Sequence, residues 1–78
     1  MQTKFKKVHL KSGLSQEELA YHSETSLRMV QTLDQGSRNI NKVNITDVVK
    51  LAYTLKCKFE DIIEDEEVVE MLREMYKN

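Results

Sequence analysis

The sequence predicts a small all-α domain, and three features of its 78 residues support this. Apolar residues recur at intervals of three and four, which is the spacing of one helix face, and no segment alternates with the period of a strand. The chain contains no proline, and its two glycines, Gly13 and Gly36, stand where helices are expected to end. Capping residues precede the apolar stretches. We therefore expect five helices and one additional short helix at the carboxyl end.

The first two helices are expected before the middle of the chain. The first carries Phe5, Val8 and Leu10 and ends near Gly13. The second begins in Ser15-Gln16-Glu17-Glu18, which has the pattern of a capping box. In that motif the serine hydroxyl accepts from the third helical amide, and the glutamate accepts from the amide of the serine. This pairing predicts where the second helix starts.

A third helix is expected to follow after a short turn. Ser26 is placed to cap it, Val30 and Leu33 face inward, and Gly36 ends it. The segment 37–43 is polar and basic, and its composition predicts a loop.

The remaining helices are expected after residue 43. Asn44, with Asp47 three residues on, is placed to cap a fourth helix. Its apolar residues are Ile45, Val48, Val49, Ala52 and Leu55. The run from Phe59 to Ile63 suggests a short fifth helix. Asp65-Glu66-Glu67 then places negative charge at the positive end of a last helix. That helix carries an apolar stripe of Val68, Val69, Leu72, Met75 and Tyr76.

The two parts of the chain differ in charge. Residues 1–58 carry ten lysines and arginines against five acidic residues, whereas residues 59–78 carry two against eight, so the net charge of −1 hides a basic body and an acidic tail. We divide the chain into a domain at 1–64 and an acidic amphipathic helix at 65–78. A basic body is compatible with phosphate contacts on one face. Composition alone does not require them.

Cysteine use and hydropathy indicate the compartment. The single cysteine, Cys57, cannot form an intramolecular disulfide, which favours a reducing environment. The opening residues lack the apolar stretch of a signal peptide, and no run reaches the ~20 apolar residues of a membrane span. We expect a cytoplasmic protein without membrane contact. His9, His22 and Cys57 lack metal-ligand spacing, so no metal is expected. No pattern typical of an enzyme or of a cofactor site is present.

A set of residues at fixed offsets spans roughly three quarters of the chain. It begins with Phe5, Val8 and His9 and continues in Gly13-Leu14-Ser15-Gln16-Glu17-Glu18-Leu19-Ala20. The later members are Ser26, Val30, Leu33-Asp34-Gln35-Gly36, Asn44-Ile45, Val48, Leu51-Ala52, Leu55 and the run from Phe59 to Ile63. In this set the chain resembles the Cro/repressor-type helix-turn-helix family, often called the XRE family. The resemblance implies a phage-repressor-like DNA-binding domain.

The resemblance also implies that residues 26–35 form a recognition helix that lies in the major groove of duplex DNA. Its outer side carries the expected base contacts, which are Leu27, Arg28, Gln31 and Thr32. Arginine forks onto guanine, glutamine onto adenine, and an apolar side chain meets the thymine methyl. These side chains are therefore expected to read sequence.

Phosphate contacts are implied on both sides of that helix. Gln16 and Ser26 stand at the starts of the second and third helices, where free amides attract anions. Arg38, Asn39 and Lys42 lie in the loop that follows the recognition helix. Phosphate contacts position a protein on DNA but carry no sequence information.

Two pairs of positions depart from the family pattern. The family commonly joins its first helix to the end of the recognition helix with arginine and glutamate, where this chain has His9 and Asp34. We expect these two residues to form the equivalent pair. Ser23 occupies a position that is normally apolar. Glu24 stands where a small residue usually takes a left-handed backbone, at a cost to a non-glycine residue of ~1–2 kcal/mol.

We expect a sequence-specific binder of double-stranded DNA that regulates transcription, with repression as its mode. A homodimer joined through Val68, Val69, Leu72, Met75 and Tyr76 is expected, because paired half-sites add affinity and register. The same stripe is also suited to pack on its own domain. A second hypothesis is an antitoxin or other interaction subunit whose acidic tail contacts a protein partner. A third is a scaffold that keeps the fold without affinity for DNA.

Overall fold

The computed structural model describes residues 2–77, and in this range it is all-helical. The α-helices are α1 (Lys4–Ser12), α2 (Gln16–Ser23), α3 (Leu27–Gln35), α4 (Ile45–Leu55) and α5 (Glu66–Tyr76), and the 3-10 helices are η1 (Ile40–Lys42) and η2 (Phe59–Asp61). The all-α prediction is confirmed. The expected helix at residues 59–63 is a single 3-10 turn. Met1 and Asn78, at the outer ends of the two expected domains, lie outside the described residues.

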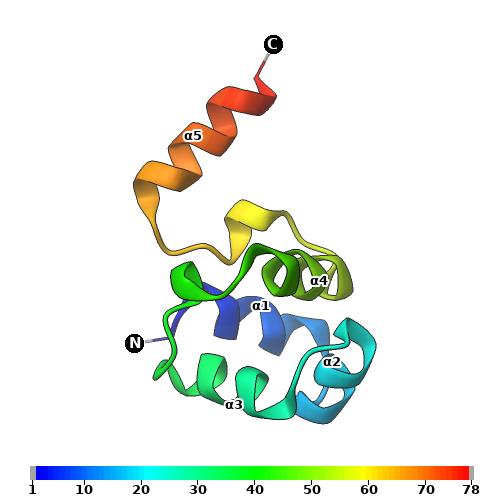
Figure 1. Ribbon diagram of the computed structural model, residues 1–78. Coiled ribbons are helices and arrows are strands. Elements are labelled where there is room, and N and C mark those ends of the chain that lie inside the picture. Colours follow the sequence, from blue (N-terminus) through cyan, green and yellow to red (C-terminus); the bar gives the residue numbers. More distant parts are fainter. Residues whose placement is uncertain (1, 78) are drawn as a thin grey trace.

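The helices divide into a body and a projecting arm. Helices α1 to α4 pack together, whereas α5 stands out from them at the end opposite α3 (Figure 1). The longest dimension of the described chain is accordingly 38 Å, against 23 and 22 Å for the other two. Asp65 begins the arm by capping α5 with its carboxylate, which accepts from the amides of Glu67 and Val68. The two ends of the molecule are therefore separate surfaces.

The starts of three helices follow the predicted caps. The Ser15 hydroxyl accepts from the Glu18 amide at 3.0 Å, and the Ser15 amide donates to Glu18 Oε1 at 2.8 Å, so the capping box of α2 is complete. Ser26 and Asn44 cap α3 and α4 through their side-chain oxygens. The hydrogen bonds from Ser15 hold the pKa of Glu18 below its ordinary value, because they favour the carboxylate.

A single core fills the space between the helices of the body and η2. The most deeply buried side chains are Phe5, Leu19, Val30, Leu33, Val48, Leu51, Ile62 and Val69. Every α-helix contributes at least one of them, with Val69 from α5, and Ile62 follows η2. The arm is thus attached to the body by the inner side of its first turns.

Some expected core positions differ in the structure. Leu10, Ile45 and Val49 are exposed, at 56%, 68% and 50% of their surface. Successive helical residues are rotated by about 100°, so Leu10 points away from the core side on which its neighbour His9 is buried. In α4 the residues that reach the core are Val48, Leu51, Ala52 and Leu55. Ile45 and Val49 lie on the outer side of this helix. Conversely, the expected loop at 37–43 contains η1 and buries Ile40.

The turn between α2 and α3 explains the two departures at Ser23 and Glu24. Ser23 is buried, but its hydroxyl donates to the Leu19 carbonyl at 2.6 Å and lies 2.8 Å from the Thr25 hydroxyl. Glu24 has φ 57° and ψ 39°, which is the left-handed conformation. The amides of Glu24 and Thr25 donate back to the last turn of α2. The buried hydroxyl of Ser23 therefore has hydrogen-bond partners, whereas the backbone of Glu24 is strained.

Replacing Glu24 with glycine is expected to stabilise the fold. A left-handed backbone costs a non-glycine residue ~1–2 kcal/mol, and the greater freedom of glycine in the unfolded chain offsets part of the gain. We expect a net increase of ~0.5–1 kcal/mol in the free energy of unfolding, measured by urea denaturation. Glu24→Ala, which removes the side chain but keeps Cβ, should give no such gain.

The reverse substitution provides the matched test. Gly13 ends α1 with φ 75°, and a Cβ added there would meet no atom within 4 Å. Gly13→Ala should therefore lose ~1–2 kcal/mol through the backbone alone. Equal stability of Glu24→Gly and wild type would contradict the strain assigned to the turn.

Candidate nucleic-acid interface

Helix α3 has one buried and one exposed side. Val30 and Leu33 are 0% and 2% exposed, so the opposite side of the helix faces outward. That side carries the four expected base-contact residues Leu27, Arg28, Gln31 and Thr32, which adjoin one another at spacings of one and four. Arg28 is exposed, Leu27 is 38% exposed, and the other two are partly buried. Because α3 lies at one end of the body, this surface is accessible (Figure 1).

The segment after α3 turns back and fixes Arg38 against the helix. The amides of Ser37 and Arg38 donate to the Thr32 carbonyl at 3.1 and 3.2 Å. Arg38 Nε donates to Thr32 Oγ1 at 2.8 Å, and that hydroxyl donates to the Arg28 carbonyl at 2.8 Å. The Thr32 hydroxyl therefore both donates and accepts a hydrogen bond within the chain. The bond to Nε leaves the two terminal nitrogens of Arg38 for a ligand.

The other expected phosphate ligands share a common arrangement. Ser26 Oγ accepts from the Met29 amide at 3.0 Å, and Asn39 Oδ1 accepts from the Asn41 amide at 2.9 Å. A serine hydroxyl and an asparagine amide that accept in this way still have hydrogens to donate. Lys42, at the end of η1, is exposed. The caps thus consume acceptors and leave donors, which suits an anionic ligand.

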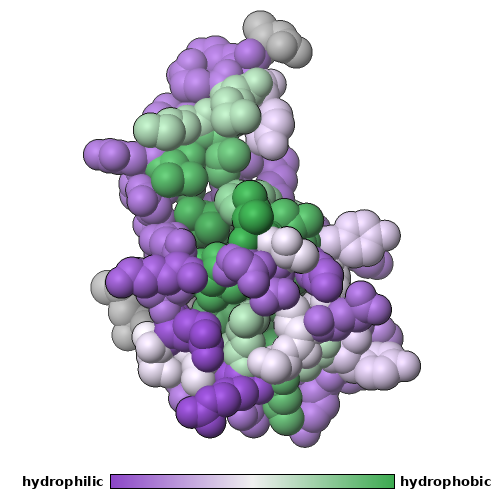
Figure 2. Space-filling view, viewed as in Figure 1, coloured by the Kyte–Doolittle hydropathy of each residue, from purple (hydrophilic) through white to green (hydrophobic). Residues whose placement is uncertain are grey.

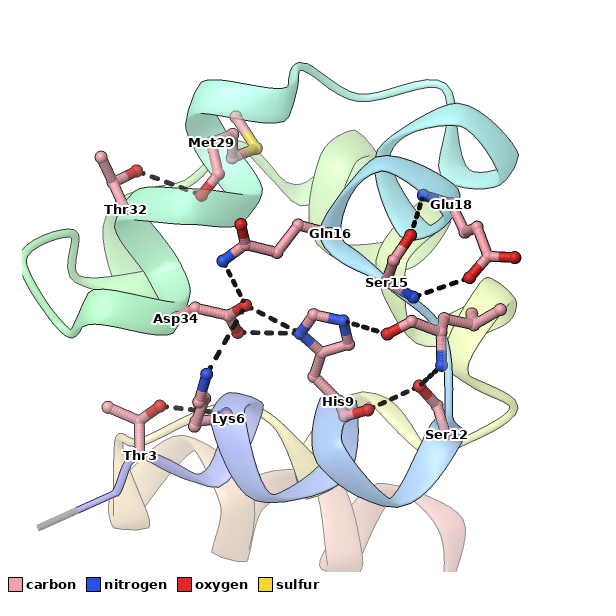
Figure 3. Close-up of polar contacts among 11 residues, drawn as sticks. Thr3, Lys6, His9, Ser12, Ser15, Gln16, Glu18, Met29, Thr32 and Asp34 are labelled. Carbon is pink, nitrogen blue, oxygen red and sulfur yellow. Dashed lines mark hydrogen bonds and ion pairs between the residues drawn. The ribbon is translucent and has the colours of Figure 1, made fainter.

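Gln16 lies at the start of α2 and points towards Asp34 at the end of α3 (Figure 3). Its Nε2 donates to Asp34 Oδ2 at 3.0 Å. The amide nitrogen carries two hydrogens, so this bond leaves one for a second acceptor. Asp34 therefore orients the Gln16 side chain without using all of its donors.

Asp34 is the centre of a buried polar network that we call the Asp34 network, formed with His9, Gln16 and Lys6. The Asp34 side chain is 2% exposed, and His9 Nδ1 lies 2.9 Å from each of its oxygens (Figure 3). His9 Nε2 lies 2.9 Å from the Leu14 carbonyl. Both ring nitrogens of His9 therefore face oxygen acceptors. Lys6 Nζ lies farther away, at 3.9 Å.

The apolar stripe expected on the last helix is divided between two sides of α5. Val69 is 1% exposed and Leu72 is partly buried, so these two residues face the body. Val68, Met75 and Tyr76 are 36%, 71% and 71% exposed. Met71, which was not among the residues expected on the stripe, is 59% exposed. The spacing of residues 68, 71 and 75 marks one helix side and would have identified it.

Burial, together with the negative charge of Asp61, raises the pKa of the half-buried Cys57 thiol. Residues 2–77 hold no cluster of three His, Cys, Asp or Glu side chains placed to bind a metal ion. Within the same range, no helix has the length and apolar character needed to cross a bilayer.

Comparisons of the chain with protein-family models, with curated proteins and with solved structures found no match.

The His9–Asp34 pair is expected to be a major source of stability. Removing one partner of a buried charged pair leaves the other uncompensated, at a cost of ~3–5 kcal/mol. We expect losses of this order for His9→Ala and Asp34→Ala, and a double variant that loses much less than their sum. Lys6→Ala is the control, because this cation is 30% exposed and 3.9 Å away, so ~1 kcal/mol or less is expected. Additive losses in chemical denaturation would contradict a coupled pair.

Proposed function

We propose that this protein binds double-stranded DNA in a sequence-specific manner and regulates transcription as a repressor. The observation that carries the proposal is the outer side of α3, where Leu27, Arg28 and Gln31 are presented on a helix at one end of the molecule. The major groove admits an α-helix and displays a distinct donor and acceptor pattern for each base pair. Side chains of these types at the start of a helix are suited to read that pattern.

The surroundings of α3 support the proposal. Arg38 is held beside the helix by Thr32, and the caps at Ser26 and Asn39 leave donor hydrogens for phosphate oxygens. Lys42 adds a cation on the same segment. These groups would hold the phosphate backbone of the DNA in position while side chains of α3 contact the bases.

Charge distribution removes the objection raised by the net charge of −1. Most acidic residues lie after residue 58, and α5 stands at the end opposite α3 (Figure 1). Phosphates bound along α3 would therefore be far from the carboxylates of α5, and salt largely screens interactions between exposed charges more than about 10 Å apart. DNA binding does not require a positive net charge when the most acidic helix lies away from the binding surface.

The homodimer expected from the sequence stays a prediction. A pair of α3 helices spaced by one turn of DNA would gain affinity and register. Of the five residues expected to join two copies, Val69 is in the core of its own domain. A second candidate function, an interaction subunit, is favoured by the exposed apolar side of α5.

Arg28 is expected to read a base, and Lys42 to contact phosphate. A preferred site would first be selected from a library of random duplexes. On that site Arg28→Ala should lose ~1–3 kcal/mol of binding free energy and relax preference at one base pair. Lys42→Ala should weaken binding to all DNA sequences alike. It should also reduce the slope of log affinity against log salt concentration by about one. Lys77→Ala, at the far end of the molecule, is the control. Equal, sequence-independent losses from Arg28→Ala and Lys42→Ala would show that α3 does not enter the groove as proposed.

Thr32 is expected to act through Arg38 and not by touching a base, because its hydroxyl donates its one hydrogen to Arg28 and accepts from Arg38. Thr32→Val removes the acceptor of Arg38, so affinity should fall by a few-fold for all sequences, as in Arg38→Ala. The double variant should lose no more than either single one. Thr32→Ser keeps the hydroxyl and should bind normally. A changed preference at one base pair in Thr32→Val would instead identify Thr32 as a base contact.

A further inference from the structure

Helix α5 carries an exposed apolar row with a carboxylate border. Val68, Met71 and Met75 follow one another at spacings of three and four and are 36%, 59% and 71% exposed. Glu67, Glu70 and Glu74 lie beside this row. We call these six residues the α5 face. Figure 2 shows apolar side chains gathered along the arm and continuing onto the body.

The row extends into a groove at the base of the arm. The groove has a volume of about 240 Å³ and lies between η1, α4 and the start of α5. Val43, Ile45, Phe59 and Val68 are among its lining residues. Ile45 is 68% exposed, and Val49 on the same helix is 50% exposed. Apolar residues scattered singly need no explanation, but a continuous exposed patch bordered by polar groups marks an interaction site.

The charges of the α5 face decide between two kinds of occupant. Helix α5 contains four glutamates and one arginine, and Arg73 is already paired with Glu70 at 3.3 Å. A second copy packed along this row would bring the same glutamates. In an antiparallel pair, Glu67 of one copy would lie near Glu74 of the other, and like charges so placed are unfavourable. A partner with basic residues on either side of an apolar stripe would complement both features.

We infer that the α5 face binds a basic amphipathic helix of another protein, an inference that rests on the second candidate function, the interaction subunit. Helices of this kind lie in apolar grooves through residues at spacings of three, four and seven. Methionine suits such a surface, because its flexible thioether adapts to side chains of different shape. The occupant is thus a cationic helix with its apolar stripe against Val68, Met71 and Met75, and its lysines or arginines against the glutamates.

The site is independent of the proposed DNA surface. The arm and α3 lie at opposite ends of the molecule (Figure 1), so one ligand need not displace the other. If the protein failed to bind DNA, binding of a basic helix to the α5 face would be unaffected. If no helix bound to the α5 face, the proposed binding of DNA would be unaffected.

The test uses the whole chain and a model peptide of about 18 residues, composed of leucine and lysine with leucines at helical spacing. A peptide of identical composition but scrambled order is its control. Calorimetry is expected to show one peptide per chain, with at least tenfold weaker binding of the scrambled form. Arg28→Ala, at the proposed DNA surface, should leave the peptide affinity unchanged within about twofold.

Variants locate the site. Met71→Glu/Met75→Glu should weaken peptide binding at least tenfold, whereas Leu10→Glu, at another exposed apolar residue, should not. Glu67→Gln/Glu70→Gln/Glu74→Gln should weaken it several-fold at low salt, and Glu17→Gln/Glu24→Gln should leave it unchanged. Any dimer that sedimentation of the chain alone detects should persist in Met71→Glu/Met75→Glu.

Two results would overturn the inference. Equal affinity for the patterned and scrambled peptides, with no effect of Met71→Glu/Met75→Glu, would mean that the peptide is attracted by net charge alone. A dimer that is abolished by Met71→Glu/Met75→Glu would mean that a second copy covers the face.

Discussion

The buried carboxylate of Asp34 is the contact on which the arrangement of the first three helices depends. It stands in the last turn of α3 and is bonded to His9 from α1 and Gln16 from α2 (Figure 3). A charge removed from water in this way is tolerated only with close partners. The partners come from two other helices, so the position of α3 is coupled to both. The outer side of α3 and the start of α2, which carry most of the candidate DNA contacts, are therefore held in a defined relation.

Local capping adds a second constraint that also shapes the candidate site. Ser26 and Asn39 each use a side-chain oxygen to accept a backbone amide. The Ser26 hydroxyl and the Asn39 side-chain amide therefore keep hydrogens that can be donated to the proposed ligand. Thr32 differs, because its hydroxyl both donates to Arg28 and accepts from Arg38. A hydroxyl with both capacities occupied is better suited to position a neighbour than to recognise a base.

The sequence predicted the helices and their caps well, because these depend on neighbouring residues such as Ser15 with Glu18. The position of the left-handed turn at Glu24 also followed from the family resemblance. The resemblance did not predict that a glutamate would be tolerated in this conformation. Predictions failed where tertiary packing decides the outcome. Ile40 is buried within a polar segment, and Ile45 is exposed on an apolar helix. The satisfied hydroxyl of Thr32 was equally beyond local patterns, because its partner Arg38 returns from the next segment.

The separation of charge along the chain becomes a separation in space because α5 projects from the body. If the arm lay along α3, its glutamates would oppose phosphate at the proposed DNA surface, and the exposed row of Val68, Met71 and Met75 would be covered. Instead, only the inner side of α5 is attached, chiefly through Val69. The first turns of the arm hold it in place, and the last turns remain exposed, with Met75 and Tyr76 each 71% exposed. The same attachment that keeps acidic residues away from α3 thus leaves an apolar, acidic surface available at the opposite end of a molecule only 38 Å long.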